Sequence, residues 1–80
     1  MREEILLPQW GMGMTEGTVV AWLKAVGDPL TEDEEIAEIE SAKASVMLES
    51  PCTGTLVEIL VAAGETVEVR TPLAIAETNR

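Results

Sequence analysis

The stretch EGTVVAWL at residues 16–23 is repeated 37 positions later as TGTLVEIL at residues 53–60. The match continues without a gap to residue 40 and its counterpart 77, and eight of the 25 aligned positions are identical. Self-similarity at a fixed spacing is the signature of a duplicated structural unit. The sequence therefore predicts two copies of one supersecondary element.

Each copy has the side-chain pattern of a β-strand followed by a turn. Residues 18–23 and 55–60 alternate between two faces and are rich in β-branched side chains. A Gly-acid pair follows in each copy, Gly27-Asp28 and Gly64-Glu65, which is a turn signal. Short strands are then expected at 29–30 and 66–67, and longer ones at 34–40 and 72–77. Pro29 and the Thr71-Pro72 pair argue against helix.

Two such copies of about four strands each are expected to close one core. We therefore predict an all-β fold: a flattened sandwich or barrel of two four-stranded antiparallel sheets with pseudo-twofold symmetry. Eighty residues form one domain, assigned to residues 1–80 with its core at about 5–77.

The apolar side chains available for this core are almost all aliphatic. The chain is 46% hydrophobic but has no Phe, no Tyr and two Trp. Trp22, in the middle of a strand, is expected in the core, whereas Trp10, in a Gly/Met loop, is expected to be partly buried. Met12 and Met14 are expected to fill gaps under that loop.

Charge and composition exclude several classes of function. The net charge of −10 argues against nucleic acids and anionic membrane surfaces as partners. Without His, and with Cys52 as the only cysteine, the chain lacks imidazole catalysis, an intramolecular disulfide and a cysteine-rich zinc site. No long apolar run or signal peptide is present. A monomeric cytoplasmic domain is expected, or one of the mitochondrial matrix in a eukaryote.

Lys43 lies between the two copies, in the segment ESAKAS at residues 40–45. Apolar alternation stops at Ile39 and resumes at Val46, so a hairpin turn is expected, with Lys43 as its one long side chain. Adding the repeat spacing to position 43 gives Arg80, the last residue. The turn is therefore expected opposite the chain ends. An exposed lysine is usually only a solubilising charge. From the turn alone, this interpretation and that of a functional lysine are about equally supported.

The chain resembles the lipoyl domains of the acyltransferase component of 2-oxo acid dehydrogenase complexes. The segments that carry the resemblance are LPQWGMGMTEG at residues 7–17, WLK and VGD at 22–28, IESAKA at 39–44, Ser50-Pro51 with Gly54, and Leu73-Ala74. The resemblance implies that Lys43 carries a covalent lipoyl group. It also implies that Glu40, Gly27 and Gly54 help the lipoylating enzyme to recognise the domain, and that the loop from Trp10 to Thr15, with Met12 and Met14, contributes to partner recognition.

Ala42 and Ala44, the residues beside Lys43, are also expected to take part in recognition, and they leave alternatives open. Most such domains have Asp before the lysine, where this chain has Ala42. A similar pattern with an uncharged residue occurs in the glycine-cleavage carrier protein, and an unmodified β-sandwich interaction module is a further alternative. Biotin carriers flank their lysine with methionines, so Ala42 and Ala44 argue against biotin.

The resemblance implies a non-catalytic swinging-arm carrier of acyl groups and reducing equivalents, in a 2-oxo acid or acetoin-type dehydrogenase complex. Its implied partners are a thiamin-dependent 2-oxo acid dehydrogenase, the acyltransferase core, a flavin dihydrolipoamide dehydrogenase and a lipoate ligase or transferase. The cofactor would be lipoic acid on Lys43. No base, nucleophile and oxyanion-binding set is recognisable, which favours a carrier over an enzyme.

Overall fold

The computed structural model describes residues 1–42 and 44–78 of the chain, which form β-strands and no helix. The strands are β1 (Arg2–Leu6), β2 (Glu16–Trp22), β3 (Pro29–Leu30), β4 (Glu35–Glu40), β5 (Ser45–Glu49), β6 (Gly54–Ile59), β7 (Thr66–Glu68) and β8 (Pro72–Glu77). The expectation of an all-β fold is confirmed. Within the described part of the chain, no segment has the helical length and apolarity needed to cross a bilayer.

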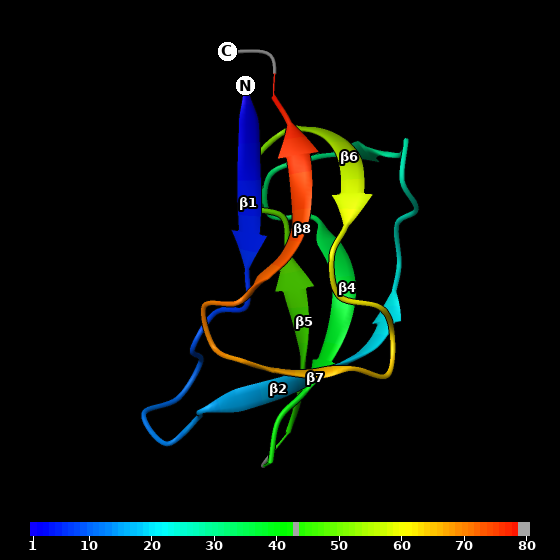
Figure 1. Ribbon diagram of the computed structural model, residues 1–80. Coiled ribbons are helices and arrows are strands. Elements are labelled where there is room, and N and C mark those ends of the chain that lie inside the picture. Colours follow the sequence, from blue (N-terminus) through cyan, green and yellow to red (C-terminus); the bar gives the residue numbers. More distant parts are fainter. Residues whose placement is uncertain (43, 79–80) are drawn as a thin grey trace.

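The strands form two antiparallel four-stranded sheets (Figure 1). Their orders are β1-β8-β6-β3 and β5-β4-β2-β7. The sandwich is elongated, measuring 35 × 22 × 18 Å. Neither copy of the repeat forms a sheet alone, because each sheet takes two strands from each half of the chain. The two copies therefore depend on one another for both strand pairing and core.

The duplication predicted from the sequence is visible in the backbone. A shift of 37 residues carries β2, β3 and β4 onto β6, β7 and β8. Gly27 and Gly64 both have a positive φ, 98° and 95°, a conformation that glycine adopts without strain. Their N–H groups donate to the carbonyls of Leu56 and Val19 respectively, so each copy anchors its turn on the other. These two reciprocal hydrogen bonds are related by the pseudo-twofold symmetry of the domain.

The first strands of the two copies, β1 and β5, obey a different spacing. Arg2 and Ser45, where these strands begin, are 43 residues apart rather than 37. The difference lies in the connections that follow: residues 7–15 join β1 to β2, whereas residues 50–53 join β5 to β6. The first copy thus contains an insertion, the loop that includes Trp10.

The core lies between the two sheets and is aliphatic, as expected. Burial of one such side chain stabilises the fold by roughly 1.5–3 kcal/mol. The largest fully buried apolar side chains are Ile5, Leu7, Val19, Leu30, Ile36, Ile39, Cys52, Leu56 and Leu73.

Strict alternation fails at one residue in β2 and at one in β6, the corresponding strands of the two copies. The register of β2 shifts between Val19 and Ala21, and that of β6 shifts between Leu56 and Glu58. Such β-bulges insert an extra residue and change which face later side chains occupy. As a result Trp22 packs against the core although Val20, two residues earlier, is exposed.

The expected burial of the two tryptophans and of the two loop methionines is confirmed in part. Trp22 packs against the core, and its indole N–H donates to the Val61 carbonyl over 2.9 Å. Met14 also packs on the core, and Trp10 is 40% exposed, in keeping with partial burial. The expectation for Met12 is wrong: its side chain is fully exposed because the loop turns it away from the protein.

Candidate functional site

The connection between β4 and β5 is closed by Ser41 and Ala44. The Ser41 N–H and the Ser41 hydroxyl both donate to the Ala44 carbonyl, over 2.8 and 3.0 Å. Ala42 and Ala44 are exposed. Lys43, the predicted attachment residue, lies between them in the chain and outside the described residues. The turn expected around Lys43 is thus present in its described members, with small, exposed neighbours on both sides of the lysine.

This connection and the chain ends lie at opposite ends of the sandwich (Figure 1). Pseudo-twofold symmetry accounts for the placement, because Ser41 corresponds to Thr78 and Ala44 corresponds to Met1. Thr78 donates its N–H to the Met1 carbonyl over 2.6 Å and its hydroxyl to the same oxygen over 3.2 Å. The expected position of the turn, opposite the termini, is confirmed for residues 41, 42 and 44.

The loop from Trp10 to Thr15 is fixed beside this turn by backbone and side-chain hydrogen bonds. The Met14 N–H donates to the Gly11 carbonyl over 3.0 Å, and the Gln9 side-chain amide donates to the Met14 carbonyl over 2.9 Å. Where the loop ends, the Thr15 carbonyl accepts from the N–H of Val69 over 3.1 Å. The inserted loop therefore has a defined shape.

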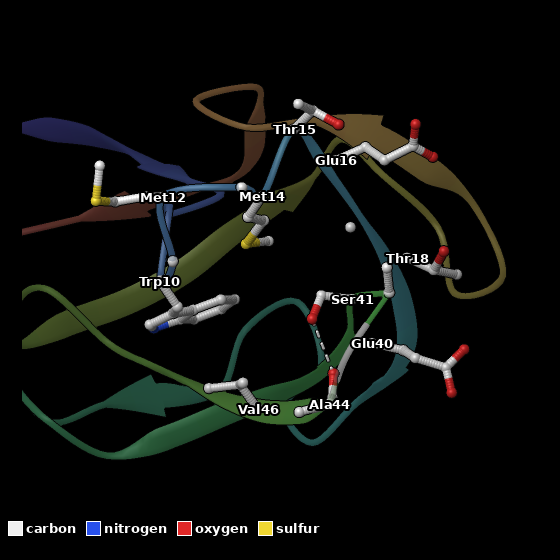
Figure 2. A pocket seen from close by; sticks show the side chains of 14 residues that line it. Trp10, Met12, Met14, Thr15, Glu16, Thr18, Glu40, Ser41, Ala44 and Val46 are labelled. Carbon is white, nitrogen blue, oxygen red and sulfur yellow. Dashed lines mark hydrogen bonds between the residues drawn. The ribbon is translucent and has the colours of Figure 1, made fainter.

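A groove of about 640 Å³ separates the loop from the turn (Figure 2). Residues 10–18 form one side of it, and Glu40, Ser41, Ala42, Ala44 and Val46 form the other. The structure therefore brings together six of the predicted recognition residues: Trp10, Met12, Met14, Glu40, Ala42 and Ala44.

Gly27 and Gly54, the other two predicted recognition residues, do not line this groove. Gly27 lies in the β2–β3 turn described above. Gly54 lies where β6 meets the end of β8, and a Cβ at this position would collide with the Glu77 carbonyl. Both glycines shape the backbone away from the turn, so any effect on recognition would act through the fold.

The described part of the chain shows no cluster of metal-binding side chains. In residues 1–42 and 44–78, no three His, Cys, Asp or Glu side chains are grouped so that they could hold a metal ion. Cys52 is fully buried in the core, away from the groove lining. What the site offers is an exposed turn of small residues beside a partly apolar groove.

Lys24, the other lysine of the chain, is held in an ion pair. Its ammonium lies 2.9 Å from Glu34 Oε2, and the Lys24 and Glu34 side chains are 22% and 35% exposed. The hydrogen bond from Lys24, followed by one from the Thr31 N–H, holds the pKa of Glu34 below its ordinary value of about 4.5. Lys24 thus has a structural partner.

Comparison with known proteins identifies the family. Residues 3–75 match the model of the biotin/lipoyl family, described as biotin-requiring enzyme. The chain belongs to the biotin/lipoyl attachment domain family. It is 41% identical over 77 residues to the dihydrolipoyllysine-residue acetyltransferase component of the pyruvate dehydrogenase complex of Corynebacterium glutamicum, covering 95% of this chain and 11% of that protein.

Another relative places a biotin/lipoyl domain in a different host protein. The chain is 45% identical over 76 residues to the beta subunit of the pyruvate dehydrogenase E1 component of Rhizobium meliloti, covering 94% of this chain and 16% of that subunit. The chain thus spans less than a fifth of either curated relative.

A solved member of the biotin/lipoyl family has the same fold over almost its full length. This is the lipoyl domain of the 2-oxoglutarate dehydrogenase complex from Azotobacter vinelandii, with a TM-score of 0.73 and 26% identity. The alignment covers 95% of this chain and 99% of that domain. The expected resemblance and the predicted sandwich are both confirmed.

Several residues that line the groove of this chain were not predicted from the sequence to have a role in recognition. Glu16, Gly17, Thr18 and Ser41 line the groove but were not assigned a recognition role. Val46, where apolar alternation resumes, had been interpreted only as the start of a strand. Its place opposite Trp10 depends on the inserted loop, whose path the 37-residue repeat does not describe.

Proposed function

We propose that this chain is a swinging-arm carrier domain that holds lipoic acid in amide linkage to Lys43. Its host would be a 2-oxo acid dehydrogenase complex or an acetoin-type complex. The observation that carries the proposal is the turn of Ser41, Ala42 and Ala44, whose two alanines are exposed, at the end of the sandwich opposite the chain ends. A tether attached at the termini would hold this turn away from the linker and toward partner active sites.

The described residues around Lys43 fit such a group. Ala42 and Ala44 are small and exposed, so they leave space for a long arm. The two hydrogen bonds from Ser41 to Ala44 stiffen the turn, which fixes the point from which the arm would extend. When bound, lipoic acid supplies a dithiolane ring that accepts acyl groups and electrons. The domain itself would be non-catalytic.

The partners follow from this role. A thiamin-dependent 2-oxo acid dehydrogenase would load the arm, the acyltransferase core would unload it, and a flavin dihydrolipoamide dehydrogenase would reoxidise it. A lipoate ligase or transferase would attach it. Flexible tethering would raise the local concentration of the arm at each active site. We place the protein in the bacterial cytoplasm, or in the mitochondrial matrix for a eukaryotic source.

Attachment is tested by intact mass after co-expression with a lipoate ligase. The wild-type chain and Lys24→Arg should each gain the mass of one lipoyl group, and Lys43→Arg should gain none. Because Lys24→Arg removes the only other lysine, it controls for the general effect of losing an amine. A wild-type chain that gains no mass, or a gain that persists in Lys43→Arg, would contradict the proposal. The first outcome would favour an unmodified interaction module.

A further inference from the structure

The insertion in the first copy exists only at the end of the sandwich that carries the Ser41–Ala44 turn. Nine residues join β1 to β2, whereas four residues make the equivalent β5–β6 connection at the opposite end. All six residues from Trp10 to Thr15 line the groove beside the turn. The one large departure from pseudo-twofold symmetry therefore builds a surface next to the proposed attachment residue.

The side chains on the two walls of this groove make one part of it apolar. In Figure 2 the Trp10 indole lies between Met14 and Val46, while Met12 points away. A Cβ built on Gly17 would lie 3.2 Å from Met14 Cε, so the missing side chain leaves room for Met14. At the other end of the molecule the position equivalent to Val46, 43 residues earlier, is the acidic Glu3. The apolar wall is thus specific to the turn end.

We propose that this groove is a resting site for the domain's own lipoyl arm, with Trp10, Met14 and Val46 contacting the hydrocarbon chain and the ring. This inference rests on the proposed function. The arm is the occupant that the position favours, since Ala42 and Ala44 flank Lys43 in the chain and both line the groove. Its amide linkage makes it neutral and largely apolar, which matches these walls.

The charges at the groove distinguish the attached arm from free lipoate. Glu16 and Glu40 also line the groove, and none of the other described residues that line it carries a basic side chain. An anion in this position would be repelled, whereas a neutral amide would not. The groove should therefore accept lipoamide, a neutral analogue of the arm, in preference to free lipoate.

Because the arm is tethered to the domain, weak contacts are enough to hold it in the groove for part of the time. A short flexible link gives an effective concentration in the millimolar range, so contacts worth a Kd of about 1 mM would keep the arm in the groove roughly half of the time. Such an arm is sheltered between transfers yet still free to leave. The exposed indole of Trp10, at 40% exposure, has area available for this contact.

Nuclear magnetic resonance of the loaded 80-residue chain tests the inference, with loading confirmed by intact mass. Wild type should show nuclear Overhauser effects between arm protons and both the Trp10 indole and the Met14 methyl group. These should persist in Leu23→Ala, which removes an exposed apolar side chain outside the groove, and be lost in Trp10→Ala. Lipoamide added to Lys43→Gln, which lacks the lysine charge, should shift the same Trp10 signals more than free lipoate does.

Two outcomes would overturn the inference while leaving the proposed function intact. A fully loaded chain whose arm contacts nothing beyond residues 40–46 has no resting site in the groove. A loaded chain whose Trp10 signals move only when the dehydrogenase is added would assign the groove to that partner. A chain that gains no lipoyl mass instead overturns the proposed function itself, so the two failures are distinguishable.

Discussion

Ser41 and Thr78 are equivalent residues at opposite ends of the sandwich. Each donates its backbone N–H and its side-chain hydroxyl to one carbonyl oxygen, Ser41 to Ala44 and Thr78 to Met1. The same local structure thus closes a turn at one end and joins the two termini at the other. The duplication therefore places the Ser41–Ala44 turn and the chain termini at opposite ends of the domain.

The junction of Gly54 with β8 should tolerate no side chain. A Cβ at Gly54 would overlap the backbone of Glu77, which cannot move without disturbing the β6–β8 pairing. Gly54→Ala should therefore lower the free energy of unfolding by about 1–3 kcal/mol, the usual cost of overpacking, as measured by chemical denaturation. Gly13→Ala is the control, because a Cβ there meets no atom within 4 Å. Equal stabilities for the two variants would contradict the account.

The ion pair with Glu34 should slow the acylation of Lys24. Attack on an acyl donor needs an accessible amine, and the Lys24 side chain is 22% exposed, with its ammonium hydrogen-bonded to a carboxylate that Thr31 also holds. In the second copy the equivalent position is the buried Val61, which explains why the lysine stem lies partly inside. Glu34→Gln should raise the rate at which acetic anhydride acetylates Lys24, measured by peptide mass spectrometry.

Glu35→Gln is the matched control for this prediction. Glu35 is the next residue and is exposed. Its substitution removes the same charge without touching the pair, so the Lys24 rate should stay at the wild-type value. If Glu35→Gln accelerates acetylation as much as Glu34→Gln does, net charge rather than the ion pair governs Lys24.

The same pair should give the fold a dependence on acidic pH. The pKa of Glu34 is lowered in the folded state, by Lys24 first and then by Thr31. Its stabilising contribution is therefore complete above the ordinary pKa of about 4.5 and is lost as pH falls through the lower folded value. The difference in melting temperature between wild type and Glu34→Gln should shrink across this interval. A constant difference from pH 7 to pH 3 would contradict this assignment.

Much of the fold could be predicted because the repeat is gapless from residue 16 to residue 40. The same spacing also relates Asp33 and Arg70, which have φ values of 71° and 69°. Asp and Arg share no sequence signal for a positive φ, so the repeat did not predict this conformation. Their N–H groups donate to the carbonyls of Ser50 and Leu7, so tertiary hydrogen bonds hold the backbone there.

The groove could not be predicted in the same way. Met12 and Met14 are the same residue type two positions apart, yet Met14 packs on the core and Met12 is fully exposed. The difference arises from the Gly11–Met14 turn and the Gln9 hydrogen bond, which fix the path of the loop and which residue type alone does not indicate. The spacing of 43 between β1 and β5 was the available signal for an insertion.

Peptide mapping of this protein from its native cells tests the central claim most directly, because there the attached group is the one that the organism supplies. The account predicts that the peptide containing Lys43 carries one amide-linked lipoyl group and that the peptide containing Lys24 carries none. A biotinyl group on Lys43, or a Lys43 that is bare throughout, would contradict it.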